Sequence, residues 1–447
     1  MTGTVAGRLT RIFHAALAAV DPARLVKEAL RAGPEGLSFA SGGTVASAPW
    51  AGTRNIYLVG GGKAGRTMGE AALAVIGKRV AAGALACPAG SGGSAGALRF
   101  IEAGHPLPDS GSLSAAREIL SLLSRAGEGD LVIALISGGG SAMLSAPVEG
   151  VSPEEKATLS KLLLRAGADI ASFNTVRKHL SLVKGGRAAR AAVPARVWAL
   201  LLSDVPGDDP SVIASGPFSP DPTTYGDALE ILSRPGILHE VPRSVLRHLE
   251  AAAAGEVSET PKPGDPVFAS VSCAVVGSNR TALEAAAAAA KTEGLSPIRL
   301  LPGFLSGEAR GCAKSFVAEM RLLSSSLAPG GTAVLLAGGE TTVNVKGTGK
   351  GGRSQEFALS AALELSGTVG LTVLCGGTDG VDGPTDAAGA IADGSTCGRA
   401  EEEGLSPRSF LENNDAYSFF RAIGDLVVTG PTGTNVADVA IGLVSKT

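Results

Sequence analysis

Residues 55–65 read NIYLVGGGKAG, and the run RTMGEAALAVIG follows directly at residues 66–77. The apolar residues 56–59 predict a buried β-strand, and the second run has the composition of a helix. Between them lie three glycines, Lys63, an alanine and a fourth glycine. A strand, a glycine-rich turn and a helix in this order predict a βα unit of an α/β fold.

The same alternation of short apolar strands and helical patterns continues along most of the 447-residue chain. Most of the strands are runs of valine, isoleucine and leucine without polar alternation, which is typical of sheets covered on both faces. The predicted strands are 55–59, 83–87, 131–136, 197–202, 271–276, 297–301, 332–337, 371–375 and 425–428, and the predicted helices are 112–125, 153–168, 279–292, 307–325 and 353–365. We therefore predict an α/β fold with mostly parallel sheets and helices on both faces.

Residues 251–266 read AAAAGEVSETPKPGDP, a small, polar and proline-rich stretch that is typical of a linker. We predict an N-terminal Rossmann-like α/β domain over residues 1–250, this linker, and a C-terminal α/β domain over residues 267–447. Apolar residues between Leu9 and Val20 recur at helical spacing, which predicts an amphipathic helix rather than a signal peptide.

The composition indicates a globular protein, with 45% hydrophobic and 18% charged residues and a net charge of −3. There is no block of lysine and arginine, and there are few aromatic residues on which bases could stack, so we expect no nucleic-acid partner. No apolar run reaches the roughly 18 residues that a membrane span needs. The five cysteines are scattered, which favours reduced thiols and the cytoplasm.

In open α/β sheets, ligands bind beyond the carboxyl ends of the strands, so the loops that follow the predicted strands form the candidate site. Two of these loops are rich in glycine, and three carry acidic residues. The glycine-rich loops contain Gly61, Gly62 and Lys63, and then Ser137, Gly138, Gly139, Gly140 and Ser141. The acidic loops contain Asp204, Asp208 and Asp209, then Glu340 with Arg353 further along, and then Asp379, Asp382 and Asp386.

These residue types suit phosphate chemistry. Backbone N–H groups at a helix N-terminus, together with a lysine charge, suit a phosphate or a carboxylate. Acid-rich loops suit Mg²⁺, and an arginine completes the parts that phosphoryl transfer needs. Each part also has a structural explanation, because glycine turns allow close packing, aspartates form turns, and Arg353 pairs with Glu356 if both lie on one helix.

Two other classes of protein share some of these features. Residues 60–65 also fit G-x-G-x-x-G, but a dinucleotide site needs an acid about 20 residues further on, and none occurs between Glu70 and Glu102. An NAD(P)H-dependent reductase is therefore the weaker alternative. A non-catalytic sugar-phosphate or nucleotide sensor needs fewer acids and usually carries a DNA-binding module, which the sequence does not indicate. The common nucleotide loop G-x-x-x-x-G-K-[ST] and the protein-kinase motifs are absent as well.

Nine motifs, in order along the chain, resemble the glycerate 2-kinase family, whose C-terminal part is known as the MOFRL domain. They are VGGGKAG, GHPLPD (104–109), SGGGSA, FNTVRKHLSLVKGG (173–186), LSDVPGDDPSVIASGP (202–217), AGGETTV, GKGGRSQE, GTDGVDGPTDAAGA and TGPTGTNVAD (429–438). The resemblance runs from about residue 8 to the end of the chain. Such proteins have also been named hydroxypyruvate reductases.

The resemblance implies ATP-dependent phosphorylation of D-glycerate at its 2-hydroxyl, with Mg²⁺, giving 2-phospho-D-glycerate. It also implies two α/β domains with the active site in the cleft between them. The functional lysine and arginine of the family fall on Lys63 and Arg353, and its aspartates fall on Asp204 and Asp379. The resemblance leaves open which acid is the general base and which holds the metal.

We predict that Lys63 and Arg353 neutralise the phosphoryl group and that Asp204 or Asp379 takes the proton of the substrate hydroxyl. The substrate carboxylate is expected at the second glycine-rich loop or at a basic side chain, for which the candidates are Arg177 and Lys184. The predicted metal ligands are Asp204, Glu340, Asp379 and Asp382. The predicted partners are D-glycerate and a nucleotide, with no membrane, and the predicted state is a monomer or homodimer.

Overall fold

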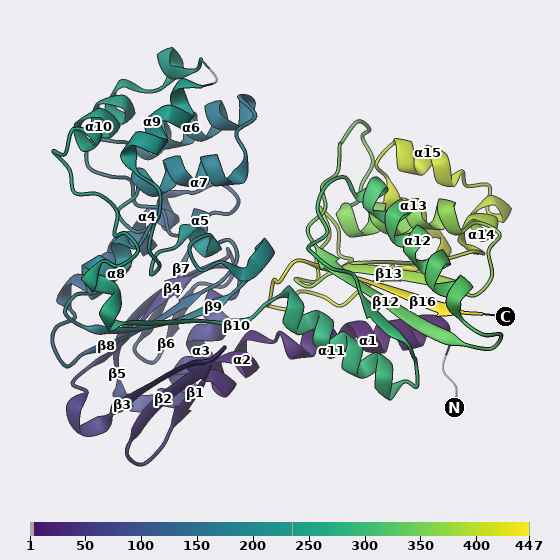
Figure 1. Cartoon of the computed structure of the whole chain (residues 1–447), viewed down its shortest axis with the longest axis horizontal. Coiled ribbons are helices and arrows are strands. Elements are labelled where there is room, and N and C mark those ends of the chain that lie inside the picture. The colour runs from purple at the N-terminus through teal and green to yellow at the C-terminus, as the bar shows by residue number, and fades with distance from the viewer. Residues whose placement is uncertain (1–3, 235, 447) are drawn as a thin grey trace. The chain divides into compact units, whose positions relative to one another are not determined.

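The computed structural model describes residues 4–234 and 236–446, which form two compact units (Figure 1). One unit, which we call the central unit, is Pro22–Val276. The other, which we call the terminal unit, combines Met1–Asp21 with Gly277–Thr447. In the described part of the chain, no helix has both the length and the apolar character that crossing a membrane requires.

The central unit is built on a seven-stranded sheet with the order β10-β9-β8-β4-β5-β7-β6. Its strands are β4 (Ile56–Gly61), β5 (Val80–Cys87), β6 (Gly93–Ala95), β7 (Leu98–Glu102), β8 (Leu131–Ile136), β9 (Arg196–Leu202) and β10 (Val271–Gly277). The pairs β4–β5, β4–β8, β5–β7 and β8–β9 are parallel, and β6 is antiparallel to β7. Every residue of β8 is buried, as its unbroken apolar run predicts.

Helices and a small second sheet surround this sheet. The helices are α2 (Pro22–Ala29), α3 (Gly65–Ile76), α4 (Ser110–Arg125), α5 (Gly140–Met143), α6 (Pro153–Arg165), α7 (Ile170–His179), α8 (Arg187–Ala192), α9 (Tyr225–Ser233) and α10 (Arg243–Ala253). Four of them, α6, α7, α9 and α10, lie together and share their own hydrophobic cluster (Figure 1). The second sheet is antiparallel and consists of β1 (Leu30–Ala32), β2 (Gly36–Ser41) and β3 (Thr44–Pro49).

Residues 251–266, which have the composition of a linker, lie inside the central unit. Helix α10 ends within them, Thr260 Oγ1 donates to Asp221 Oδ2 at 3.1 Å, and His179 Nε2 lies 3.1 Å from Glu259 Oε1. Glu259 and Thr260 therefore make buried or partly buried hydrogen bonds, whereas Glu256 and Ser258 are exposed. The chain passes from one unit to the other at residues 21–22 and 276–277, whereas the sequence places the boundary at 251–266.

The terminal unit contains a six-stranded sheet with the order β11-β12-β16-β13-β14-β15. Its strands are β11 (Ile298–Leu300), β12 (Thr332–Gly339), β13 (Leu371–Gly377), β14 (Gly389–Asp393), β15 (Leu426–Val427) and β16 (Asp438–Ser445), and its helices include α11 (Asn279–Thr292), α12 (Ala309–Ser326), α13 (Arg353–Leu365), α14 (Thr396–Glu402), α15 (Pro407–Glu412) and α16 (Ala416–Ile423). The pair β11–β12 is parallel, and β16 runs antiparallel between β12 and β13. The prediction of an α/β fold is confirmed, and the sheet of this unit is mixed.

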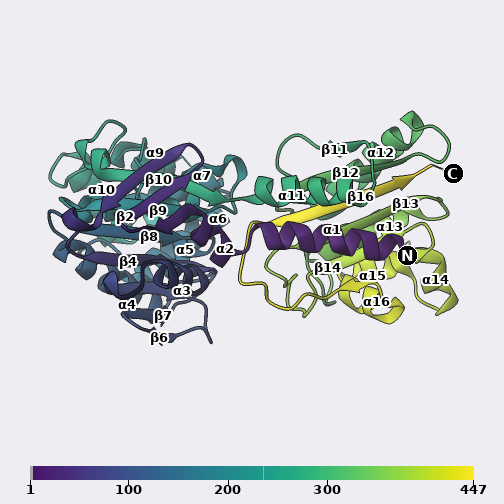
Figure 2. The ribbon, with the colours of Figure 1, turned by 90° about the horizontal axis from the view of Figure 1, so that it is seen from below.

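The N-terminal helix α1 (Val5–Ala19) belongs to the terminal unit and lies beside α11 and β16 (Figure 2). Leu9, Ile12, Phe13 and Ala16 form its buried face, so the predicted amphipathic helix is confirmed. An ion pair also joins α1 to the end of α11, because Arg11 donates to both carboxylate oxygens of Glu293 at 2.7 and 2.9 Å.

Candidate active site

The first glycine-rich loop, at the end of β4, is a backbone turn that requires glycine. Gly60 and Gly62 have φ of 137° and 135°, in the region that L side chains rarely adopt. A Cβ atom at Gly62 would lie 2.3 Å from Ser137 Oγ and 2.5 Å from Ser137 O, closer than real Cβ atoms approach. The turn therefore packs directly against the loop that follows β8.

Lys63 belongs to the first glycine-rich loop and packs against the second. Its backbone N–H donates to Gly138 O at 2.8 Å, and the N–H of Ala64 donates to Ser137 Oγ at 3.0 Å. A Cβ atom at Gly139 would lie 3.4 Å from Lys63 Cγ. Both the backbone and the side-chain stem of Lys63 therefore contact the second loop.

The strands that carry these loops meet where the sheet reverses its order. From β4 the sheet continues through β5 and β7 on one side and through β8 and β9 on the other. In open α/β sheets, ligands bind outside the carboxyl ends of the strands at such a switch point. Both glycine-rich loops follow the carboxyl ends of the two strands at this point, β4 and β8.

Two basic side chains hold the second loop at its other end, where it continues into α5. Ser141 O accepts from Lys184 Nζ at 2.7 Å and from Arg177 Nη2 at 3.0 Å. Lys184 Nζ also donates to Leu144 O at 3.0 Å, and Lys184 is 0% exposed. Burial, and then the charges of neighbouring basic residues, lower the pKa of Lys184 well below its usual value. Lys184 thus holds the loop from a buried position, so groups other than Lys184 would contact a ligand.

The loop after β9 reaches the same place from a third strand. Asp204 lies half-buried at its start. Ala214 and Ser215 have φ of 51° and 62°, which is uncommon for residues other than glycine and costs conformational energy. In this backbone conformation, Ser215 Oγ lies 2.8 Å from Ser141 Oγ. The loops after β4, β8 and β9 are therefore neighbours within the central unit.

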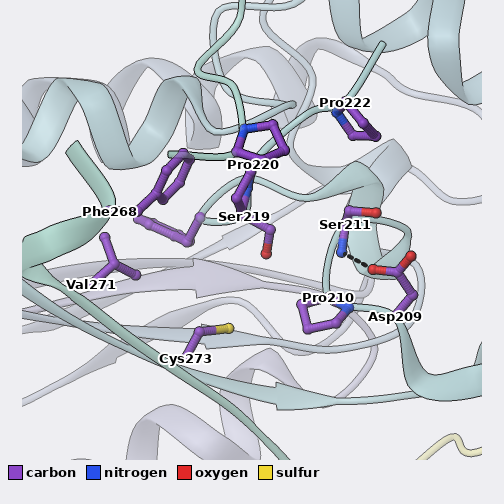
Figure 3. A pocket seen from close by; sticks show the side chains of 11 residues that line it. Asp209, Pro210, Ser211, Ser219, Pro220, Pro222, Phe268, Val271 and Cys273 are labelled. Carbon is purple, nitrogen blue, oxygen red and sulfur yellow. Dashed lines mark hydrogen bonds between the residues drawn. The ribbon is translucent and has the colours of Figure 1, made fainter. Parts of the chain in front are cut away.

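A pocket of about 380 Å³ opens beside the loop after β9 (Figure 3). Its walls come from residues 209–222 and 263–273. Phe268, Val271 and several prolines give it a mostly apolar surface, and Asp209 in its wall accepts from Ser211 N at 2.8 Å. Such a surface suits a ring or a hydrocarbon group better than a phosphate.

In the terminal unit, Arg353 begins α13, and two carboxylates hold its guanidinium. Nε and Nη2 donate to Asp438 at 2.6 and 3.0 Å, and Nη1 donates to Glu340 Oε1 at 2.6 Å. Burial lowers the pKa of Arg353, but the hydrogen bonds with Asp438 and the charges of Asp438, Glu340 and Asp382 together outweigh burial and raise it. The alternative partner on the same helix, Glu356, instead accepts from Arg310 Nε at 2.8 Å.

The acids near Arg353 gather at one edge of the six-stranded sheet. Asp438 is the first residue of β16 and pairs with Gly339 of β12 and Gly377 of β13. Because β16 is antiparallel to both, its first residue lies where they end. A Cβ atom at Gly377 would lie 3.3 Å from Asp379 Oδ1 and 3.4 Å from Asp438 Oδ1, so these two carboxylates flank the same glycine.

Asp382 caps helix α13. Its two carboxylate oxygens accept from the backbone N–H groups of Ser354 and Gln355 at 3.1 and 2.8 Å, and it is 4% exposed. Burial, followed by the charge of Asp438, raises the pKa of Asp382 to about 7. Burial also raises the pKa of Asp438 to about 6, against the effect of Arg353. Each oxygen of Asp382 thus accepts one helix N–H group, and its predicted role as a metal ligand remains a prediction.

The arrangement of acids bears directly on the predicted metal site. Among residues 4–234 and 236–446, no three His, Cys, Asp or Glu side chains are arranged to hold a metal ion. Carboxylate oxygens suit Mg²⁺ chemically, and Mg²⁺ usually binds through one or two carboxylates together with phosphate oxygens and water. Asp204 of the central unit, and Glu340 and Asp379 of the terminal unit, remain predicted ligands for such partial coordination.

Two family models match the chain. One, described as a domain of unknown function (DUF4147), matches residues 8–250, and the MOFRL family model matches residues 333–438. The chain is 43% identical to the D-glycerate 2-kinase of Thermotoga maritima over 393 residues, which cover 87% of this chain and 90% of that protein. The chain belongs to the glycerate 2-kinase family.

The likeness to glycerate 2-kinases extends to the folded structure. The crystal structure of glycerate kinase from Thermotoga maritima matches with a TM-score of 0.83 at 39% identity, covering 98% of this chain and 99% of that chain. A relative from Agrobacterium vitis, 41% identical over 98% of this chain and 94% of that protein, carries the provisional name of a hydroxypyruvate reductase. Relatives thus carry names from both enzyme classes that the sequence suggests.

Three polar residues at the candidate site were not singled out from the sequence. They are Asp438, Asn174 and Ser215. Asp438 pairs with Arg353, and Asn174 Oδ1 accepts from Ser215 Oγ at 3.2 Å. All three lie within motifs that carry the resemblance to glycerate 2-kinases. A polar residue inside such a motif is the signal that could have found them.

Replacing the buried Lys184 by methionine is expected to change the pH dependence of stability. Between the lowered pKa of Lys184 and its ordinary value of 10.5, the unfolded chain binds a proton that the folded chain does not. The free energy of unfolding therefore increases as the pH rises through this range and decreases as the pH falls. Between about pH 8.5 and about pH 9.5, the wild type should gain up to about 1.4 kcal/mol per pH unit relative to Lys184→Met.

Urea-induced unfolding of both proteins at the two pH values measures this difference. Lys161→Met, which removes an exposed lysine from α6, serves as the control and should follow the wild type. If the unfolding free energies of wild type and Lys184→Met change in parallel with pH, Lys184 titrates normally in the fold.

Proposed function

We propose that this protein transfers the γ-phosphoryl group of ATP to the 2-hydroxyl of D-glycerate, giving 2-phospho-D-glycerate and ADP. The observation that carries the proposal is the position of Lys63 in one glycine-rich loop, packed against a second, at the switch point of the sheet, in a chain of the glycerate 2-kinase family. Backbone N–H groups and a lysine charge together are suited to holding phosphate groups.

Lys63 and Arg353 neutralise the charge that spreads over the phosphoryl group during transfer. Asp438 and Glu340 fix the Arg353 guanidinium through three hydrogen bonds, so the arginine is ordered before a ligand arrives. Such preorganised charge lowers the barrier because it needs no rearrangement during the reaction.

Asp204 or Asp379 orients the 2-hydroxyl of the substrate and takes its proton. Each follows the carboxyl end of a strand, β9 in one unit and β13 in the other, which is where catalytic groups of α/β folds gather. A carboxylate is a suitable acceptor when the hydroxyl oxygen is attacking phosphorus.

Mg²⁺ bound to the nucleotide phosphates would supply further charge neutralisation. Asp379 and Glu340, with Asp204 as the alternative to a role as base, are the residues that would complete its coordination. The absence of a group of three ligating side chains among the described residues supports an ion that arrives with ATP rather than one held by the protein alone.

An NAD(P)H-dependent reductase is less well supported by the same loops. A dinucleotide site needs an acid for the ribose near the end of the second strand. Here that strand is β5, which ends at Cys87, and residues 71–101 contain no aspartate or glutamate. We also propose the cytoplasm as the location, supported by five free thiols. An active site in a cleft between the units, and a monomeric or homodimeric state, remain predictions.

The kinase and reductase functions can be separated in one pair of assays. The protein is incubated with D-glycerate and MgATP, and separately with hydroxypyruvate and either NADH or NADPH. We expect ADP to form only when D-glycerate is present, and nicotinamide oxidation to stay at the level of a control without protein. Nicotinamide oxidation without ADP formation would contradict the proposal.

A further inference from the structure

Four side chains of the central unit form a polar cluster above α5. Ser215 Oγ lies 2.8 Å from Ser141 Oγ and donates to Asn174 Oδ1 at 3.2 Å, and Arg177 Nη2 donates to Ser141 O at 3.0 Å. Ser141, Asn174 and Arg177 are partly exposed, whereas Ser215 is 1% exposed. The cluster thus joins a buried hydroxyl to three groups that a small solute can reach.

The direction of these hydrogen bonds determines what the cluster offers to a ligand. An amide oxygen only accepts, so Ser215 uses its single proton on Asn174 Oδ1, and Ser141 must donate to Ser215. The amide nitrogen of Asn174 and the Nε and Nη1 groups of Arg177 have no hydrogen-bond partner within the described residues. Ser141 Oγ keeps a lone pair. The cluster therefore presents N–H donors together with one hydroxyl acceptor.

Electrostatics indicates that the missing partner is an anion. Within residues 4–234 and 236–446, no carboxylate forms an ion pair with Arg177. Burial lowers the pKa of Arg177 to about 10, which leaves it charged at neutral pH. The adjacent Lys156 is 7% exposed and uses its Nζ on a backbone carbonyl, that of Leu180, at 3.0 Å. Buried charges in proteins are normally paired, so a positive charge without a protein counterion favours an anionic ligand.

The backbone that carries Ser215 is strained, and the Ser215 hydroxyl donates to Asn174. Two consecutive residues other than glycine, Ala214 and Ser215, adopt positive φ. This conformation brings the Ser215 hydroxyl within reach of both Ser141 and Asn174. Conformational energy is stored in this way mostly at sites where a side chain must be held in one place.

We propose that this cluster is the subsite that recognises D-glycerate: Arg177 binds the carboxylate, and Asn174 with Ser141 binds the 3-hydroxyl. This inference rests on the proposed function, and it assigns recognition of the hydroxyl that is not phosphorylated. A hydroxyl both accepts and donates, which matches the Asn174 amide nitrogen and the Ser141 lone pair. Ser215 is a positioning residue, because it acts through Asn174 and Ser141.

D-lactate, which lacks the 3-hydroxyl but keeps the carboxylate and the 2-hydroxyl, separates the two contacts. Titration calorimetry of the full chain should give tighter binding of D-glycerate than of D-lactate. Asn174→Ala and Ser215→Ala should weaken D-glycerate binding by about tenfold or more and leave D-lactate binding nearly unchanged. Arg177→Met should weaken both ligands by similar factors.

Two exposed positions provide matched controls, Ser233→Ala on α9 and Lys161→Met on α6, and both should bind like the wild type. Equal loss of both ligands in Asn174→Ala, or unchanged binding of D-glycerate, would overturn the subsite. Failure of the wild type to bind either ligand would also overturn it. An ADP assay on the wild type is run in parallel, because binding without ADP formation would contradict the proposed kinase function and not the subsite.

Discussion

Lys63→Ala is expected to lower kcat by about 100-fold or more, a loss of about 3 kcal/mol of transition-state stabilisation. The KM for D-glycerate should change far less. The backbone N–H groups of Lys63 and Ala64 donate to the second glycine-rich loop and keep these bonds in the variant, so the substitution removes only the side-chain charge. The lysine charge then matters most when negative charge spreads over the group in transfer.

Steady-state kinetics on the folded variant measures this effect, and Lys78→Ala provides the matched control. Lys78 is exposed in the short turn Gly77–Arg79 after α3, so its removal should leave kcat unchanged. If Lys63→Ala keeps a kcat near that of the wild type, Lys63 has only the structural role of filling a turn.

Arg353→Ala should also lower kcat by about 100-fold or more, and Arg353→Lys should not restore full activity. The planar fork of Arg353 makes two hydrogen bonds to Asp438 and one to Glu340. A lysine ammonium cannot reproduce this geometry, so it would not be held in the same place.

The same kinetic measurement on Arg280→Ala tests whether the effect is specific. Arg280 is an exposed residue of α11 that pairs with Glu284, and its loss should change neither kcat nor stability by much. Wild-type kcat in Arg353→Lys would show that a charge suffices without the fork. Wild-type kcat in Arg353→Ala would show that Arg353 forms ion pairs but takes no part in catalysis.

The fold could be predicted where the local pattern and the packing agree. The run at 131–136 is apolar at every position, and the strand β8 found there is buried at every position. The N-terminal helix follows the same logic, because the spacing of Leu9, Ile12, Phe13 and Ala16 places them on its buried face.

Strand β16 was not predicted, and its absence from the expected elements hid the mixed character of the six-stranded sheet. The segment begins with Asp438 and has Gly442 at its centre, and both residues are unfavourable in strands. Tertiary packing overrides this preference. A Cβ atom at Gly442 would lie 2.7 Å from Met320 Sδ, so glycine allows α12 to approach the sheet.

The candidate site could be predicted from sequence only where its parts are close together along the chain or at strand ends. Lys63 and its glycines form one turn, so their grouping is visible locally. Asp438, which holds Arg353, is 85 residues away from it in the sequence, and no local pattern links the two. Asp382 lies in an acidic loop, which predicted a metal ligand, and no local pattern indicated that it also caps α13.

Phosphorus NMR of the product formed from ATP, Mg²⁺ and D-glycerate tests the central claim most directly. A phosphate ester on C2 couples to one proton, and an ester on C3 couples to two. We predict the resonance of 2-phospho-D-glycerate, growing together with ADP. The resonance of 3-phosphoglycerate, or an unchanged ATP spectrum after prolonged incubation with folded protein, would contradict the account.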